Sequence, residues 1–147
     1  MAKKQMKFKS KKIKVDDLVF DSKKEYQRYL ELLDMEENGD ICCLQRQVKF
    51  ELLPKQQGER AVNYIADHVY VYGNVLVVED VKSKITKKQT DYIIKRKLFK
   101  FMYCNENVNK LKKSVTVKDL IFFLTGKKDI EKIYFKEYEW WKIKKCK

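Results

Sequence analysis

The spacing of apolar and polar residues predicts a helix and then a strand in the first third of the chain. Apolar residues recur at helical intervals after position 22, at Tyr26, Tyr29, Leu30 and Leu33. Ser22 stands three residues before Glu25, the spacing of a capping box, and Asn38-Gly39 supplies a stop. Residues 44–52 then show strand periodicity, with Leu44, Arg46, Val48, Phe50 and Leu52 on one side and Gln45, Gln47, Lys49 and Glu51 on the other.

The middle of the chain predicts a β-hairpin. Residues 62–72 and 75–82 are rich in β-branched and aromatic residues, and only Gly73-Asn74 separates them. A two-residue loop pairs Tyr72 with Val75, so counting back along both strands gives the register of the whole hairpin.

The second half is predicted to contain a helix and a mixed tail. Thr86 and Gln89 repeat the capping-box spacing and begin a helix that runs to about Tyr103. Its apolar residues expected to face the sheet are Ile93, Ile94, Leu98, Phe101 and Met102. Residues 116–125 are predicted to form a short helix, and residues 130–144 a strand rich in Tyr and Trp.

The order of these elements predicts one α/β or α+β domain with a mixed sheet. Residues 1–15 are interpreted as a basic, mobile arm and residues 16–147 as the domain. Its core is expected at about 18–103 and a C-terminal extension at about 105–147. A chain of 147 residues has room for one hydrophobic core.

Charge favours a polyanionic partner. The chain has 34 Lys and Arg against 21 Asp and Glu, a formal net charge of +13. Nucleic acid is the first candidate and an anionic membrane surface the second, while a generally basic proteome is the alternative. The most apolar stretch, residues 120–124, is far too short to span a bilayer, so no membrane partner is expected. The four cysteines lack metal-ligand or disulfide spacing, which favours a cytoplasmic protein.

The hairpin register brings two carboxylates together. Counting back from the loop places Asp67 opposite Asp80, and Lys82 lies two residues further on the same face. Two carboxylates and an ammonium on apolar strands suit a hard divalent cation, and we predict Mg²⁺. His68 and Glu79 face each other on the opposite face and are interpreted as a structural or surface pair.

Roles follow from this geometry. Asp67, Asp80 and the Val81 carbonyl would hold the metal, and Lys82 would orient the attacking water or stabilise the transition state. Alternatively, the two aspartates are ordinary strand-end residues that Lys82 neutralises. Glu25 is fully explained as a helix cap, although a first-turn Glu can also reach across to the metal site.

Basic residues follow the hairpin directly. They form either a solvated helix face or a surface that tracks phosphates. On the second interpretation the nucleic-acid-binding residues are Lys84, Lys87, Lys88, Lys95, Arg96 and Lys97.

Four short motifs occur in order within residues 18–103. They are Phe-Asp-Ser-Lys-Lys-Glu at 20–25, Tyr-Ile-Ala-Asp at 64–67, Val-Glu-Asp-Val-Lys at 78–82, and Thr86-Lys87 with Lys97-Leu98-Phe99. Together they resemble a small phage and prophage nuclease family of the PD-(D/E)XK superfamily. That family is also similar to the TnsA endonucleases that cleave transposon ends and to Holliday-junction resolvases of this fold.

The resemblance implies a restriction-endonuclease-like αβββαβ core, dependence on Mg²⁺ or Mn²⁺, and hydrolysis of DNA. Carried over to this chain, Asp67 and Asp80 would be metal ligands, Lys82 the catalytic lysine and Glu25 the acidic residue of the first helix. Members often act as homodimers, so a homodimer is expected, in the host cytoplasm if the chain is phage-encoded. Ala66 stands where the superfamily nominally has proline.

These observations predict a Mg²⁺-dependent DNA endonuclease, with duplex DNA or branched DNA such as Holliday junctions as candidate substrates in phage recombination or replication. The first alternative is a non-catalytic, basic nucleic-acid-binding module that keeps the fold. The second is an interaction protein in which Trp140-Trp141 forms an exposed patch, although these residues could equally close the core or a dimer interface.

Overall fold

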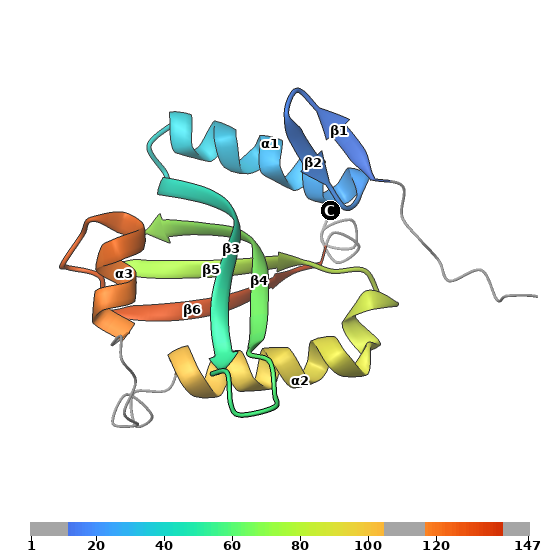
Figure 1. The fold of residues 1–147 in the computed structure, drawn as a ribbon. Coiled ribbons are helices and arrows are strands. Elements are labelled where there is room, and N and C mark those ends of the chain that lie inside the picture. Colours follow the sequence, from blue (N-terminus) through green and yellow to red (C-terminus); the bar gives the residue numbers. More distant parts are fainter. Residues whose placement is uncertain (1–11, 105–116, 140–147) are drawn as a thin grey trace, which may run out of the picture.

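The computed structural model describes residues 12–104 and 117–139, which fold around a four-stranded sheet (Figure 1). The elements in chain order are β1 (Ile13–Val15), β2 (Leu18–Phe20), α1 (Lys23–Glu37), β3 (Cys42–Leu53), β4 (Val62–Tyr72), β5 (Val75–Val81), the 3₁₀ turn η1 (Thr86–Lys88), α2 (Thr90–Phe99), the π-helical turn η2 (Lys100–Cys104), α3 (Val117–Thr125) and β6 (Lys132–Tyr138). This order confirms the predicted mixed α/β fold and adds the small β1–β2 sheet.

The sheet has the strand order β3-β4-β5-β6. Strand β4 pairs antiparallel with both β3 and β5, whereas β6 runs parallel to β5. The β4–β5 hairpin has the predicted register, from Tyr72 opposite Val75 to His68 opposite Glu79. Gly73 adopts φ +61°, a left-handed conformation that the two-residue turn needs and that glycine adopts without steric cost.

Helices α1 and α2 cover opposite faces of the sheet (Figure 1). On the α1 face, Leu32 packs against Tyr70 and Val77. The larger core lies on the α2 face and includes Phe50, Tyr64, Ala66, Val69, Val71, Leu76, Val78, Tyr92 and Phe99. Burial of these side chains is the main favourable contribution to the fold.

Strands β3 and β4 both change faces between the same two residue pairs. Arg46 pairs with His68, and both side chains lie against Tyr29 of α1. Val48 pairs with Ala66, and both pack in the core under α2. Residues two apart in a regular strand share a face, so each strand turns over between these two pairs.

The residues at this turnover are Gln47 on β3 and Asp67 on β4. Gln47 has φ +51°, a left-handed conformation that interrupts the strand. Asp67 lies between Ala66 and His68, whose side chains point to opposite faces of the sheet. The irregularity therefore places a polar side chain from each strand at the boundary between the two faces.

The predicted basic arm extended too far into the chain. Residues 13–15, which were assigned to the arm, form β1 and pair with β2. Ile13 and Val15 alternate with Lys14, and Asp16 adopts φ +53° in the turn that follows, so the chain reverses here.

The capping box predicted at Thr86 and Gln89 was wrong, because Thr86 has a different partner. The Ser83 backbone N–H donates to Thr86 Oγ1 at 2.9 Å, and the Thr86 N–H donates to Ser83 Oγ at 3.1 Å. This reciprocal pair starts η1, and α2 begins only at Thr90.

The face of α2 was predicted correctly only in part: Leu98 packs against the core as expected, but the prediction left out Tyr92 and Phe99. Tyr92 and Phe99 are buried against the sheet, whereas Ile94 and Phe101 are about half exposed. The π-helical turn η2 follows α2 and changes the helical repeat, so a constant period does not locate the buried side beyond Phe99.

The tail contains the two predicted elements, α3 and β6, within the described residues. Trp140-Trp141 lie outside the described residues. Cys42, Cys43 and Cys104 are free thiols. Among the described residues, no helix is long and apolar enough to cross a membrane.

Candidate metal centre

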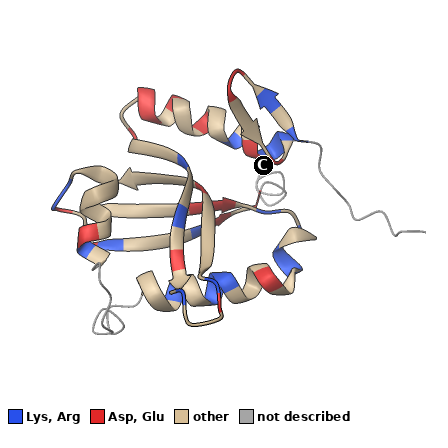
Figure 2. Ribbon diagram, in the orientation of Figure 1, with Lys and Arg blue, Asp and Glu red and all other residues tan. Residues whose placement is uncertain are grey.

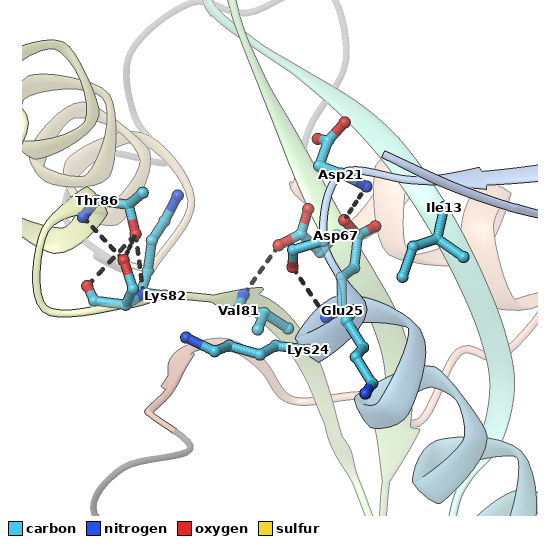
Figure 3. A pocket seen from close by; sticks show the side chains of 11 residues that line it. Ile13, Asp21, Lys24, Glu25, Asp67, Val81, Lys82 and Thr86 are labelled. Carbon is cyan, nitrogen blue, oxygen red and sulfur yellow. Dashed lines mark hydrogen bonds between the residues drawn. The ribbon is translucent and has the colours of Figure 1, made fainter. Parts of the chain in front are cut away.

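A cavity of about 520 Å³ lies between the start of α1 and the end of β5 (Figure 3). Hairpin β1–β2, the first turn of α1, β4 and the segment after β5 contribute its walls. The residues that line it are Ile13, Asp21, Ser22, Lys23, Lys24, Glu25, Asp67, Val81, Lys82, Ser83 and Thr86. Carboxylates and ammonium groups thus face the same space.

Three carboxylates meet in this cavity. Asp21, Glu25 and Asp67 each have one oxygen within 4.8 Å of the corresponding oxygens of the other two. Asp21 precedes α1 and is exposed, Glu25 is buried in the first turn, and Asp67 comes from the turnover of β4. The sequence prediction included Glu25 and Asp67 in the site and missed Asp21, although Asp21 belongs to the motif at residues 20–25.

Glu25 is held by donors from three residues. The Asp21 N–H donates to its Oε2 at 3.0 Å, Gln47 Nε2 donates to Oε1 at 2.9 Å, and an Arg46 guanidinium nitrogen lies 3.5 Å from Oε1. Ser22 caps α1 as predicted, because its Oγ accepts the Glu25 N–H. The Glu25 side chain does not complete the capping box, since it bonds the N–H of Asp21 instead of that of Ser22, and so capping does not fully explain it.

Asp67 faces the end of β5. Its Oδ2 accepts the backbone N–H of Val81 at 2.9 Å (Figure 3). Val81 also lines the cavity, so its backbone stands beside the acidic cluster. The Val81 carbonyl as a metal ligand stays a prediction.

Asp80 and Lys82 form an ion pair beside the cluster. Lys82 Nζ lies 3.0 Å from Asp80 Oδ2 and 4.0 Å from the centre of the Tyr92 ring. The predicted placement of both side chains on one face is confirmed. Asp80 is buried and lies outside the three-carboxylate cluster, but its charge acts on Asp67.

Burial and the repulsion of neighbouring carboxylates disfavour the charged forms of Glu25 and Asp67. Burial is the main cause that raises the pKa of Glu25. Burial, and then the charge of Asp80, raise the pKa of Asp67 well above its ordinary value. The Tyr64 hydroxyl is buried without a hydrogen-bond partner in the described structure, and burial followed by the charges of Asp80 and Asp67 raises its pKa.

This donor set fits a hard divalent cation. Mg²⁺ and Mn²⁺ prefer carboxylate, carbonyl and water oxygens, and Mg²⁺ takes few ligands from protein. Glu25, Asp67 and Asp21 could provide such oxygens, with Asp80 behind them. A cation there would also relieve the repulsion between the clustered acids.

His68 and Glu79 form part of a buried structural network. Glu79 accepts two hydrogen bonds from Arg28 of α1, at 2.8 and 2.9 Å, and one from the Tyr70 hydroxyl. His68 Nδ1 lies 3.6 Å from Glu79, and both residues are 0% exposed. The pair is therefore not on the surface, and the sequence prediction missed Arg28, which joins α1 to β5.

The predicted nucleic-acid-binding residues differ in their surroundings. Lys87 pairs with Glu139 and lies 3.5 Å from Glu137, and Arg96 lies 3.1 Å from Glu137. Lys84, Lys88 and Lys97 are exposed, and Lys95 is half-buried. Figure 2 shows basic residues at the start of α1 and on the η1–α2 segment.

A protein-family model described as "Protein of unknown function (DUF1064)" matches residues 5–119. All the acidic residues of the site and Lys82 lie within this match, whereas Glu137 and Glu139 of the β6 region lie beyond it. No curated protein and no solved structure matches the chain.

Proposed function

The chain belongs to the DUF1064 family, and we propose that it is a divalent-metal-dependent endonuclease that hydrolyses phosphodiester bonds in DNA. One observation carries this proposal: Asp21, Glu25 and Asp67 converge within 4.8 Å beside the ion pair of the buried Asp80 with Lys82. Burying carboxylates beside one another costs free energy, and a bound cation would offset this cost.

The residues around the cavity have complementary roles in this proposal. A divalent cation, when bound, would supply Lewis-acid stabilisation of the phosphodiester and lower the pKa of water. Lys82 places a fixed positive charge at the cavity wall, where it would stabilise the charge that develops on the phosphate. Asp80 orients Lys82 through the 3.0 Å ion pair, and the Tyr92 ring packs against the ammonium at 4.0 Å.

The net charge of +13 supports a polyanionic substrate. We infer that exposed lysines of the η1–α2 segment contact DNA phosphates on either side of the cut, in duplex or branched DNA. A homodimer would place two such cuts. Free thiols at Cys42, Cys43 and Cys104 suit a reducing compartment such as the cytoplasm.

One observation favours a non-catalytic DNA-binding module instead. Asp80 is paired with Lys82 and lies outside the cluster of three carboxylates, so the two predicted metal ligands are not equivalent. A module of this kind would bind DNA in a salt-dependent way and would need no divalent metal.

A cleavage assay separates the two functions. Labelled four-way junction, flap, duplex and single-stranded DNA are incubated with wild type, Asp67→Asn, Asp80→Asn and Lys82→Ala, each with Mg²⁺, Mn²⁺ or EDTA. We expect metal-dependent cleavage by wild type, loss of cleavage in the two aspartate variants, and a loss of about 10²–10³-fold in Lys82→Ala. DNA binding in EDTA is expected to persist in all three.

Asp129→Asn is the matched control, because it removes one exposed carboxylate far along the chain from the site. Thermal unfolding checks that each variant is folded. Full cleavage by any one of the three site variants contradicts the assigned roles. Tight DNA binding by wild type without cleavage of any substrate supports the binding module.

A further inference from the structure

Gln47 has an unusual backbone for its place in the sheet. It lies between the pairs Arg46–His68 and Val48–Ala66, where β3 changes faces. Its φ of +51° is one that residues other than glycine, asparagine and aspartate rarely adopt. Strained conformations of this kind persist only where the surroundings hold them, and they cluster at functional sites.

The turnover directs the Gln47 side chain toward the metal centre. Gln47 Nε2 donates to Glu25 Oε1 at 2.9 Å, across 22 positions of sequence. Gln47 is exposed, so core packing does not account for this placement. The same irregularity places Asp67 of β4 within 4.8 Å of Glu25.

Gln47 makes the shorter of the two side-chain hydrogen bonds to Glu25. The Arg46 guanidinium is 3.5 Å from the same oxygen, donates to the Val19 carbonyl at 2.9 Å and stacks 3.9 Å from the Phe20 ring centre. An amide fixes a carboxylate without cancelling its charge. Each carboxylate oxygen has two lone pairs, so Glu25 keeps acceptor capacity for a cation.

We propose that Gln47 is a positioning residue of the metal centre, which holds Glu25 Oε1 in the three-carboxylate cluster from the point where β3 turns over. This inference rests on the proposed function, because it concerns how the chain prepares its acidic cluster for a divalent cation. Gln47 acts through Glu25 and does not itself contact the reacting atoms.

Two substitutions test the role while sparing the backbone. Gln47→Gly removes the amide and tolerates φ +51°, and Gln47→Asn also tolerates this conformation but has a shorter side chain. The matched control is Cys43→Gly, because Cys43 lies on the same strand with φ +59° and does not contact Glu25. Each variant is made in the full chain.

The main readout is Mn²⁺ binding without DNA, followed by electron paramagnetic resonance. We expect both Gln47 variants to bind Mn²⁺ about 10- to 100-fold more weakly, the usual effect of losing an outer hydrogen bond to a metal ligand. The Mg²⁺ concentration for half-maximal cleavage should rise by a similar factor, while the rate at saturating Mg²⁺ stays close to wild type. Thermal stability of Gln47→Gly should equal or exceed that of wild type.

The outcomes separate this inference from the proposed function. Unchanged Mn²⁺ affinity in both Gln47 variants, with metal binding and cleavage by wild type intact, overturns the positioning role alone. Equal weakening in Cys43→Gly, or weakening only in proportion to lost thermal stability, overturns it as well. Absence of Mn²⁺ binding and cleavage in wild type contradicts the proposed function itself.

Discussion

Glu79 keeps a negative charge in a fully buried position on β5. Burial alone would raise its pKa, but the His68 ring at 3.6 Å and hydrogen bonds from Arg28 and Tyr70 outweigh this effect. They lower the pKa of Glu79 to about 2, from an ordinary value of 4.5. The folded state therefore favours the ionised form more than the unfolded state does.

This difference gives a pH dependence with a definite sign. The stability that Glu79 contributes is fully present above pH 4.5 and is lost as the pH falls toward 2. Glu79→Gln removes the only buried carboxylate paired with Arg28 among the described residues, so we expect a loss of about 3–5 kcal/mol at pH 7. The free energy of unfolding of the variant should therefore fall less than that of wild type as the pH drops from 4.5 to 2. Urea unfolding between pH 7 and pH 2 measures this difference.

Glu31→Gln is the control for this measurement. Glu31 also pairs with Arg28, at 2.9 Å, but its side chain is 52% exposed. Solvent screening keeps the expected loss below about 1 kcal/mol. If Glu79→Gln and wild type lose the same free energy of unfolding between pH 4.5 and pH 2, the ionised Glu79 network is not the cause.

At the scale of elements, the first turn of α1 positions much of the acidic cluster. Ser22 Oγ accepts the Glu25 N–H at 3.2 Å, and this bond begins the helix. Ser22→Ala removes the cap and should reduce the free energy of unfolding by about 1 kcal/mol. Ser22→Thr keeps a hydroxyl acceptor and should recover most of this loss. Urea unfolding of the three proteins tests this, and equal stability of Ser22→Ala and wild type would contradict it.

Most of these elements could be predicted from the sequence, because the length of a loop or the spacing of two nearby residues determines them. The two-residue loop at Gly73-Asn74 fixed the hairpin register, because one loop length leaves one pairing. The spacing of Ser22 and Glu25 located the start of α1 for a similar reason. Local rules could thus place Asp67, Asp80 and Lys82 near one another.

The remaining site residues depend on tertiary structure. Gln47 reaches Glu25 only because β3 turns over, and alternation along residues 44–52 gives no sign of that change. Asp21 joins the cluster because α1 packs next to β4, a contact between distant segments. Tyr92 and Phe99, seven residues apart, share one face of α2 and pack in the core, so tertiary packing chose which of the possible helical faces is buried.

For the molecule as a whole, the charge surplus is not uniformly available to a partner. Lys87 and Arg96 are engaged with Glu137 and Glu139 near the end of β6. Lys84 and Lys88 are exposed, and within the described residues neither has a carboxylate at ion-pair distance. Their ammonium groups can therefore approach a phosphate without first leaving an ion pair.

This contrast predicts different effects on DNA binding. In EDTA, the affinity for duplex DNA should fall as salt rises, because binding releases counterions from phosphates. Lys84→Ala and Lys88→Ala should each reduce the magnitude of the slope of log affinity against log salt by about 1. Lys87→Ala and Arg96→Ala should change it less, since their charges are already compensated. Fluorescence anisotropy over a salt series measures this, and equal slopes for all four variants would contradict the distinction.

Strand β3 forms one edge of the sheet, and its irregular backbone affects how that edge can meet other chains. A long, regular edge strand offers an unpaired row of N–H and C=O groups that invites intermolecular pairing and aggregation. Left-handed residues at Cys43 and Gln47 divide the 12-residue strand into shorter regular segments. The distortion that turns Gln47 toward Glu25 therefore also makes this edge a poor template for an added strand, and we expect it to protect the protein from edge-to-edge polymerisation.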